Sequence, residues 1–164
     1  MLVIGIDPGT AITGYGLIQA DQDGNLKAVA YGVIRTSPGT PSADRLLSLY
    51  RKLVDILHLH HPESGAVERL FFQRNVRTAM NVGQARGVAL LALAQSGVSI
   101  EEYTPLEIKQ AVAGYGGADK YQVQQMVRAL LNLNEIPKPD DAADALAIAI
   151  CHFHSLRFHR LYSE

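Results

Sequence analysis

The sequence predicts one domain of the α/β class, built around five strands. Three apolar, strand-like segments come first, at residues 2–7, 13–20 and 26–36, and the short turns between them predict an antiparallel meander. Beyond the meander, helical patterns alternate with two more strand-like segments, at residues 65–72 and 98–103. A chain of 164 residues is typically one domain and buries roughly two-thirds of its unfolded surface.

The opening strand ends in a carboxylate. The residues before Asp7 are apolar on both alternating faces, which is typical of a central strand buried on both sides. An ionised side chain at the end of such a strand rarely serves packing alone. The alternative is a turn cap, because an Asp before Pro8 and Gly9 can accept hydrogen bonds from the turn backbone. The choice depends on whether other carboxylates reach Asp7.

Glu68 and two aspartates of the last predicted helix are the other candidate acids. Glu68 lies in the middle of the predicted strand 65–72, where its charge needs compensation unless an edge strand turns it toward water. Asp141 and Asp144 are three residues apart and share one face of a helix that we expect Asp140 to cap. Apolar residues crowd around Asp144, so this face requires a cation.

A divalent metal site follows if that helical face packs against the sheet near Asp7 and Glu68. Four carboxylates would then converge, and their oxygens are the ligands that hard divalent cations prefer. Two Mg²⁺ ions about 4 Å apart would activate a water molecule and stabilise the leaving oxygen of an in-line phosphodiester cleavage.

A long helix is predicted at residues 75–94, and its second half has no polar face. A helix that is apolar all round needs cover on every side. Gly83 and Gly87 would allow another backbone to approach closely. We therefore expect a homodimer with this helix at its centre. The alternative is that other helices of the same subunit cover it.

Composition limits the remaining choices. The longest fully apolar stretch, residues 88–94, is too short to span a bilayer, and we expect no signal peptide and no membrane partner. The single cysteine, Cys151, suits the reducing cytoplasm. The formal net charge is −1, but residues 69–128 hold seven basic side chains and four acidic ones. A mildly basic middle is compatible with a cationic surface around an acidic pocket.

Capping patterns mark two helix starts in the second half of the chain. Thr104 with Glu107, and Asp119 with Gln122, have the spacing of a capping box. Along the last helix, His152 and His154 are expected to cover surface.

Five motifs in the same order resemble RuvC-type Holliday junction resolvases over nearly the whole chain, to about residue 155. They are GIDPG at residues 5–9, TGYG at 13–16, Glu68 before LFF at 70–72, GQARG at 83–87 and DAADALA at 141–147. Each motif is weak alone, and the five in register are highly specific. The tail, residues 156–164, has no clear counterpart, so we expect a nuclease domain at residues 1–155 followed by a tail.

The resemblance implies a ribonuclease-H-like fold, with a five-stranded mixed sheet and helices on both faces. It also implies a cytoplasmic homodimer that uses Mg²⁺, with Mn²⁺ as a substitute, to nick opposed strands of four-way junction DNA in recombination and repair, beside the RuvA–RuvB branch-migration complex. The positions that match the family's catalytic, metal-binding acids are Asp7, Glu68, Asp141 and Asp144. The positions that match its DNA contacts are Phe71, Arg74, Lys109 and Lys120.

Three other interpretations remain open from the sequence. The GIDPGT opening also resembles the first phosphate loop of the actin, Hsp70 and sugar-kinase superfamily, but such ATPases need two related domains and this chain is too short for both. A RuvX-type nuclease of ribosomal RNA processing shares the opening strand. A junction-binding module without chemistry ranks last, because all four acids are present.

Overall fold

A computed structural model describes residues 1–69 and 75–162. The five predicted strands form one sheet. They are β1 (Leu2–Asp7), β2 (Ile12–Ala20), β3 (Leu26–Arg35), β4 (Ser64–Glu68) and β5 (Ser99–Tyr103). Their order in the sheet is β3-β2-β1-β4-β5. The meander β1-β2-β3 is antiparallel, whereas β4 and β5 run parallel to β1, so the sheet is mixed as predicted.

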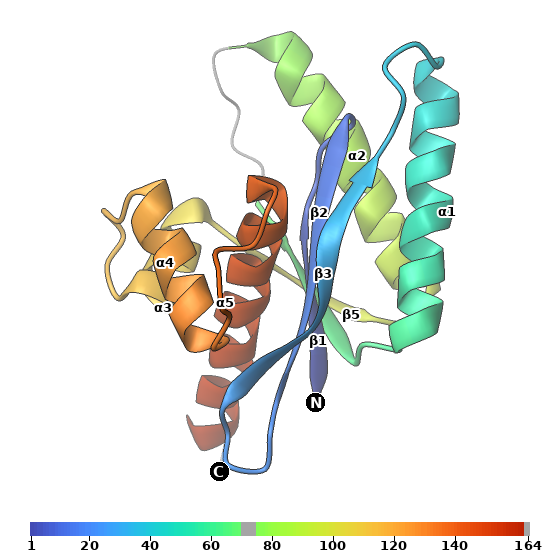
Figure 1. Ribbon diagram of the computed structural model, residues 1–164. Coiled ribbons are helices and arrows are strands. Elements are labelled where there is room, and N and C mark those ends of the chain that lie inside the picture. The colour runs from blue at the N-terminus through green and yellow to red at the C-terminus, as the bar shows by residue number, and fades with distance from the viewer. Residues whose placement is uncertain (70–74, 163–164) are drawn as a thin grey trace.

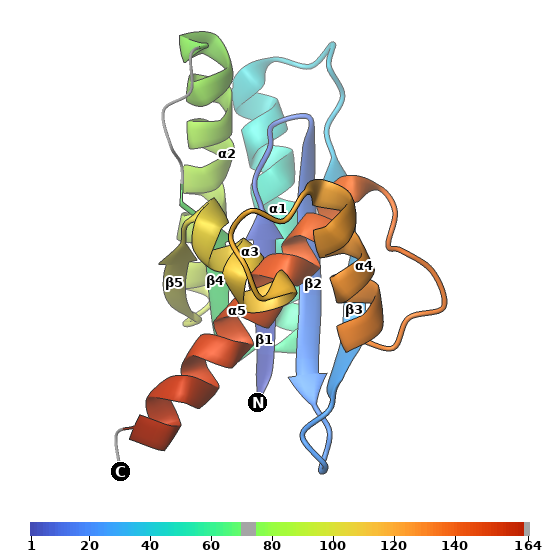
Figure 2. The ribbon, with the colours of Figure 1, turned by 90° about the vertical axis from the view of Figure 1, so that its left-hand side faces the viewer.

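The helices cover both faces of this sheet (Figure 1). They are α1 (Ser42–His60), α2 (Val76–Gln95), α3 (Pro105–Ala113), α4 (Lys120–Leu130) and α5 (Asp140–Tyr162). Helices α1 and α2 lie on one face, and α3, α4 and α5 lie on the other, with α5 directly against the strands (Figures 1 and 2). Each face has its own apolar core. The predicted class and layer arrangement are therefore confirmed.

Strand β1 is the centre of both cores. Val3, Ile4 and Ile6 are fully buried, with Val3 in the core under α5 and the two isoleucines in the core under α1 and α2. This alternation follows from the period of two in a strand, since successive side chains enter opposite layers. The prediction of a central strand buried on both sides is confirmed, and Asp7 is its last residue.

Several local predictions were wrong. Strand β4 ends at Glu68, so this acid lies at the strand's end and not in its middle, and β4 is no edge strand because β1 and β5 flank it. Asp140 is the first residue of α5, and its carboxylate pairs with Lys120. His152 is 1% exposed, because Ser64 Oγ and the Tyr103 hydroxyl satisfy its two ring nitrogens at 2.8 and 3.0 Å.

Helix α5 runs without interruption to Tyr162, so the predicted domain boundary at residue 155 falls inside a helix. None of the helices in residues 1–69 and 75–162 has the length and apolar content that crossing a bilayer requires.

Candidate active site

The ends of two parallel strands place Asp7 and Glu68 side by side. In the β1–β4 ladder Ile6 is opposite Val67, so the next residue of each strand is one of the two acids. Parallel neighbours end at the same edge of a sheet. Both carboxylates therefore project from the carboxyl edge of the sheet, which is the usual place for ligand sites in open α/β sheets.

Helix α5 reaches this edge because glycines of the meander leave room for it. A Cβ built on Gly14 would come within 1.9 Å of the Asp141 carbonyl oxygen, and one on Gly5 within 2.2 Å of the Ala145 carbonyl oxygen. Any larger residue would hold the helix away from β1 and β2. The close approach brings Asp144, on the next turn after Asp141, over the end of β1.

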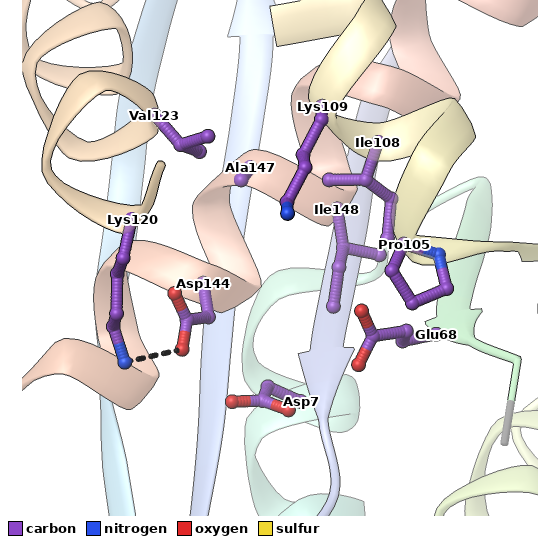
Figure 3. Close-up of a pocket in the computed structure, with 10 residues that line it drawn as sticks. All are labelled: Asp7, Glu68, Pro105, Ile108, Lys109, Lys120, Val123, Asp144, Ala147 and Ile148. Carbon is purple, nitrogen blue, oxygen red and sulfur yellow. Dashed lines mark ion pairs between the residues drawn. The ribbon is translucent and has the colours of Figure 1, made fainter. Parts of the chain in front are cut away.

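A cavity of about 230 Å³ opens at this point. Figure 3 shows the carboxylates of Asp7, Glu68 and Asp144 around its floor, with Lys109 and Lys120 on its walls. The apolar part of the lining comes from α3, α4 and α5, through Pro105, Ile108, Val123, Ala147 and Ile148. The predicted convergence of carboxylates from the sheet with those of α5 thus holds for Asp7, Glu68 and Asp144.

The carboxylates around this cavity have too few positive charges near them to balance their own. The pKa of Asp7 is raised to about 8, first by burial and then by the neighbouring charges of Asp144, Glu68 and Asp141, against a smaller opposing effect of Lys120. Burial is also the main reason why the pKa of Glu68 lies above its ordinary value, with Asp144 adding to the increase and Lys109 opposing it. Crowded carboxylates with raised pKa values are typical of sites that bind a cation or carry out acid–base chemistry.

Lys120 supplies part of the missing positive charge. Its Nζ lies 3.1 Å from Asp140 Oδ2 and 3.4 Å from Asp144 Oδ2. The pKa of Asp144 is nevertheless raised, because burial outweighs the opposing effect of Lys120, and Asp141 and Asp140 add to the increase. One partly exposed lysine therefore does not neutralise the acids.

The donor set fits magnesium. Carboxylate oxygens are hard ligands, they lie at the floor of an open cavity, and a bound cation would offset the cost of burying their charges, which the raised pKa values of Asp7 and Glu68 reflect. Within the described residues no group of three or more histidines, cysteines or acids already surrounds a single point. To hold one ion together, the side chains would therefore have to turn toward it.

The other predicted site residues have different outcomes. Asp141 is half-buried and does not line the cavity, although its charge acts on Asp7 and Asp144. Phe71 and Arg74 lie outside the described residues, so their predicted DNA contacts stay predictions. The pairing of Asp140 with Lys120 was not predicted, because an acid at the start of a helix is typical of a cap. The pair of adjacent acids at residues 140–141 was the available signal.

A ribonuclease-H-like sheet with acids at two strand ends and on the helix that crosses them defines a class of metal-dependent nucleases. Comparison with known proteins specifies the family. The family model "Crossover junction endodeoxyribonuclease RuvC" matches residues 3–152. The chain belongs to the RuvC family, whose members are in general metal-dependent nucleases, and the ribosomal RNA-processing alternative is not favoured.

Relatives with high sequence identity support membership of the RuvC family. The chain is 58% identical over 161 residues to the crossover junction endodeoxyribonuclease RuvC of Pelotomaculum thermopropionicum, covering 98% of this chain and 97% of the relative. Identity to the RuvC of Desulfitobacterium hafniense is 62% over 157 residues, covering 95% and 94%.

Two solved structures share the fold. Thermus thermophilus RuvC is similar with a TM-score of 0.90 and 39% identity, covering 97% of both chains. T. thermophilus RuvC in complex with a Holliday junction substrate is similar with a TM-score of 0.88 and 37% identity, covering 96% of both chains.

Proposed function

We propose that this protein is a structure-specific endonuclease that resolves four-way DNA junctions by paired phosphodiester cleavage in recombination and repair. The observation that carries the proposal is the cavity at the carboxyl edge of the sheet, where Asp7, Glu68 and Asp144 meet beside two lysines. Membership of the RuvC family supports the junction as the substrate, because a relative of the same fold was solved with one. In this role the protein acts in the cytoplasm beside the RuvA–RuvB branch-migration complex.

The four predicted acids have different parts in this proposal. Asp7 and Glu68 lie at the ends of β1 and β4, so they define the floor of the site and would hold the cation there. Asp144 contributes from α5, and Asp141, one turn earlier, completes the set once the side chains turn toward an ion. Asp7, whose pKa is about 8 without a cation, would have to give up its proton to hold the metal.

Two Mg²⁺ ions per site are proposed, with Mn²⁺ as a substitute. When bound, they supply charge neutralisation at the attacking and leaving oxygens of the phosphodiester. Lys109 and Lys120 stand on the wall of the cavity, where their ammonium groups can meet DNA phosphates. Phosphate contacts supply most of the affinity for DNA, so binding and cleavage depend on separate groups.

A homodimer is the proposed assembly, and α2 supports it. One face of α2 is buried against the sheet through Ala85, Ala89, Ala92 and Leu93. The other face exposes Val76, Met80 and Leu91 at 71, 61 and 59% of their surfaces, so helices of the same subunit leave them uncovered. A Cβ at Gly87 would meet nothing within 4 Å. An exposed apolar stripe beside an open glycine fits a two-fold contact with a second α2.

Site-directed changes of the acids test the proposal. Asp7→Asn, Glu68→Gln, Asp141→Asn and Asp144→Asn should each abolish cleavage of a labelled four-way junction in Mg²⁺, while junction binding in Ca²⁺ or EDTA persists. Linear duplex and precursor ribosomal RNA serve as competing substrates in the same assay. Efficient cutting of the RNA with an intact junction would overturn the assigned substrate, and near-normal cleavage by Glu68→Gln would remove Glu68 from the site.

A further inference from the structure

Lys120 is shared between a carboxylate that lines the cavity and one that does not. Asp144 is part of the lining, whereas Asp140 lies outside it at the start of α5. The Lys120 ammonium lies between them, 3.4 Å from Asp144 and 3.1 Å from Asp140. The pair Lys120–Asp140 thus joins the first residues of α4 and α5 at the rim of the cavity.

A divalent cation on Asp144 competes with Lys120 for the same carboxylate. The cation also repels the ammonium, since two positive charges a few ångströms apart cannot share one carboxylate without cost. Lys120 therefore has to leave Asp144 when the metal binds. Its long, flexible stem would let it swing into solvent, because its side chain is 56% exposed.

We propose that Asp140 is a positioning residue, which holds Lys120 at the rim of the cavity when a divalent cation takes Asp144. Asp140 already accepts the closer of the two contacts, so Lys120 can release Asp144 without moving its stem. The Lys120 ammonium then stays at the rim of the cavity, where we propose that it contacts a DNA phosphate. Asp140 also increases the affinity for the cation, because Lys120 keeps one ion pair when it releases Asp144. This inference rests on the proposed metal site.

Asp140 has two other ways to act, and the test has to separate them. As an acid at the start of α5 it interacts favourably with the helix dipole, which affects stability. As a negative charge near the cavity it attracts any cation, whether or not Lys120 is present. Only the positioning role requires Lys120, so a double-mutant cycle isolates it.

The first measurement is Mn²⁺ affinity of the DNA-free protein, followed by electron paramagnetic resonance. Lys120→Met should tighten Mn²⁺ binding, because the competing ammonium is gone. Asp140→Asn should weaken Mn²⁺ binding in the parent chain by about two- to fivefold more than in the Lys120→Met background, as expected for a partly exposed ion pair. Lys109→Met is the matched control, since Lys109 lines the same cavity and should show no coupling to Asp140.

The second measurement is the single-turnover cleavage rate at saturating Mn²⁺ and saturating junction. Asp140→Asn should lower this rate with an unchanged unfolding midpoint, and Asp140→Glu should restore it. In the Lys120→Met background the Asp140→Asn change should have no further effect.

Equal effects of Asp140→Asn on Mn²⁺ affinity with and without Lys120 would overturn the inference. A cleavage rate that falls only in proportion to a lowered unfolding midpoint would overturn it as well. Failure of the parent protein to bind Mn²⁺ would overturn the proposed metal site and this inference with it. Normal Mn²⁺ binding without Lys120–Asp140 coupling would overturn the inference alone.

Discussion

Gly14 lies directly against the backbone of Asp141, where a Cβ would come 1.9 Å from the carbonyl oxygen. In the β1–β2 ladder Gly14 is also the partner of Asp7. The absence of a side chain at this one position therefore sets the separation between the acid at the end of β1 and the acids at the start of α5. The geometry of the site depends on a residue that carries no functional group.

Gly14→Ala should displace the start of α5 and destabilise the fold. The contact atoms are backbone, which cannot rotate away, so the cost should lie near the upper end of overpacking changes, about 3 kcal/mol. Urea unfolding gives the free energy, and junction cleavage should fall even under conditions where the variant is fully folded. Gly39→Ala is the control, since a Cβ there meets nothing within 4 Å. Full activity of a folded Gly14→Ala protein would show that the geometry of the site does not depend on the missing side chain at residue 14.

The buried Asp7 should make the metal-free protein lose stability as pH rises toward about 8. Asp7 has a folded pKa of about 8 against an ordinary 3.8, so between these values the unfolded chain releases a proton that the folded chain keeps. The contribution of Asp7 to stability then falls with increasing pH, because the folded state keeps the proton at this group. His152 acts in the opposite direction between about pH 4 and 6.5, because burial lowers its pKa to about 4, so the loss due to Asp7 is clearest above pH 6.5. Asp7→Asn should flatten this dependence and raise the melting temperature at pH 8 in EDTA, and Mg²⁺ should stabilise the parent chain most at that pH.

Thermal melts of both proteins across this pH range check the prediction. Asp55→Asn changes an exposed acid on α1 and should leave the change of melting temperature with pH as it is in the parent protein. A parent protein whose melting temperature in EDTA increases from pH 6.5 to pH 8, above the range in which His152 acts, would argue against the burial of Asp7.

Much of this fold was predictable because its signals are local. The apolar run of β1 and the two capping boxes appear in the structure as predicted. Local patterns carry this information because caps and turns are decided by residues close in sequence.

The errors concern relations between distant segments. Nothing in the sequence near His152 indicates that Ser64 and Tyr103 would bond both ring nitrogens and so allow its burial. Likewise, the partner of Asp140 is on another helix, 20 residues earlier. The convergence of Asp7, Glu68 and Asp144 could be predicted because acids at the ends of apolar strands are costly, and a cost of that kind indicates compensation.

Lys109 and Lys120 should contribute separately to DNA binding. Replacing either with Ala should reduce junction cleavage, leave the fold intact and flatten the salt dependence of junction binding by about one phosphate contact. The measurement is the slope of log affinity against log salt concentration. Lys27→Ala is the control, since this exposed lysine at the start of β3 lies at the opposite end of the sheet from Asp7. Unchanged slopes together with unchanged cleavage would make both lysines ordinary surface residues.

The exposed stripe on α2 leads to the prediction for assembly. Gly87→Leu should loosen the dimer and impair junction cleavage while the monomer stays folded, because the added side chain enters open space in the single subunit and only a second subunit would meet it. Leu91→Glu should have the same effect by burying a charge in the contact.

Light scattering at micromolar concentration measures both variants against the parent chain. Leu59→Glu is the matched control, because Leu59 is an exposed leucine on the neighbouring α1 and should tolerate the charge. Paired nicking needs two sites on opposed strands, so loss of the dimer should reduce second-strand cutting more than the first nick. A mass of 17.8 kDa for the unchanged chain would remove the dimer and leave the apolar stripe on α2 without an explanation.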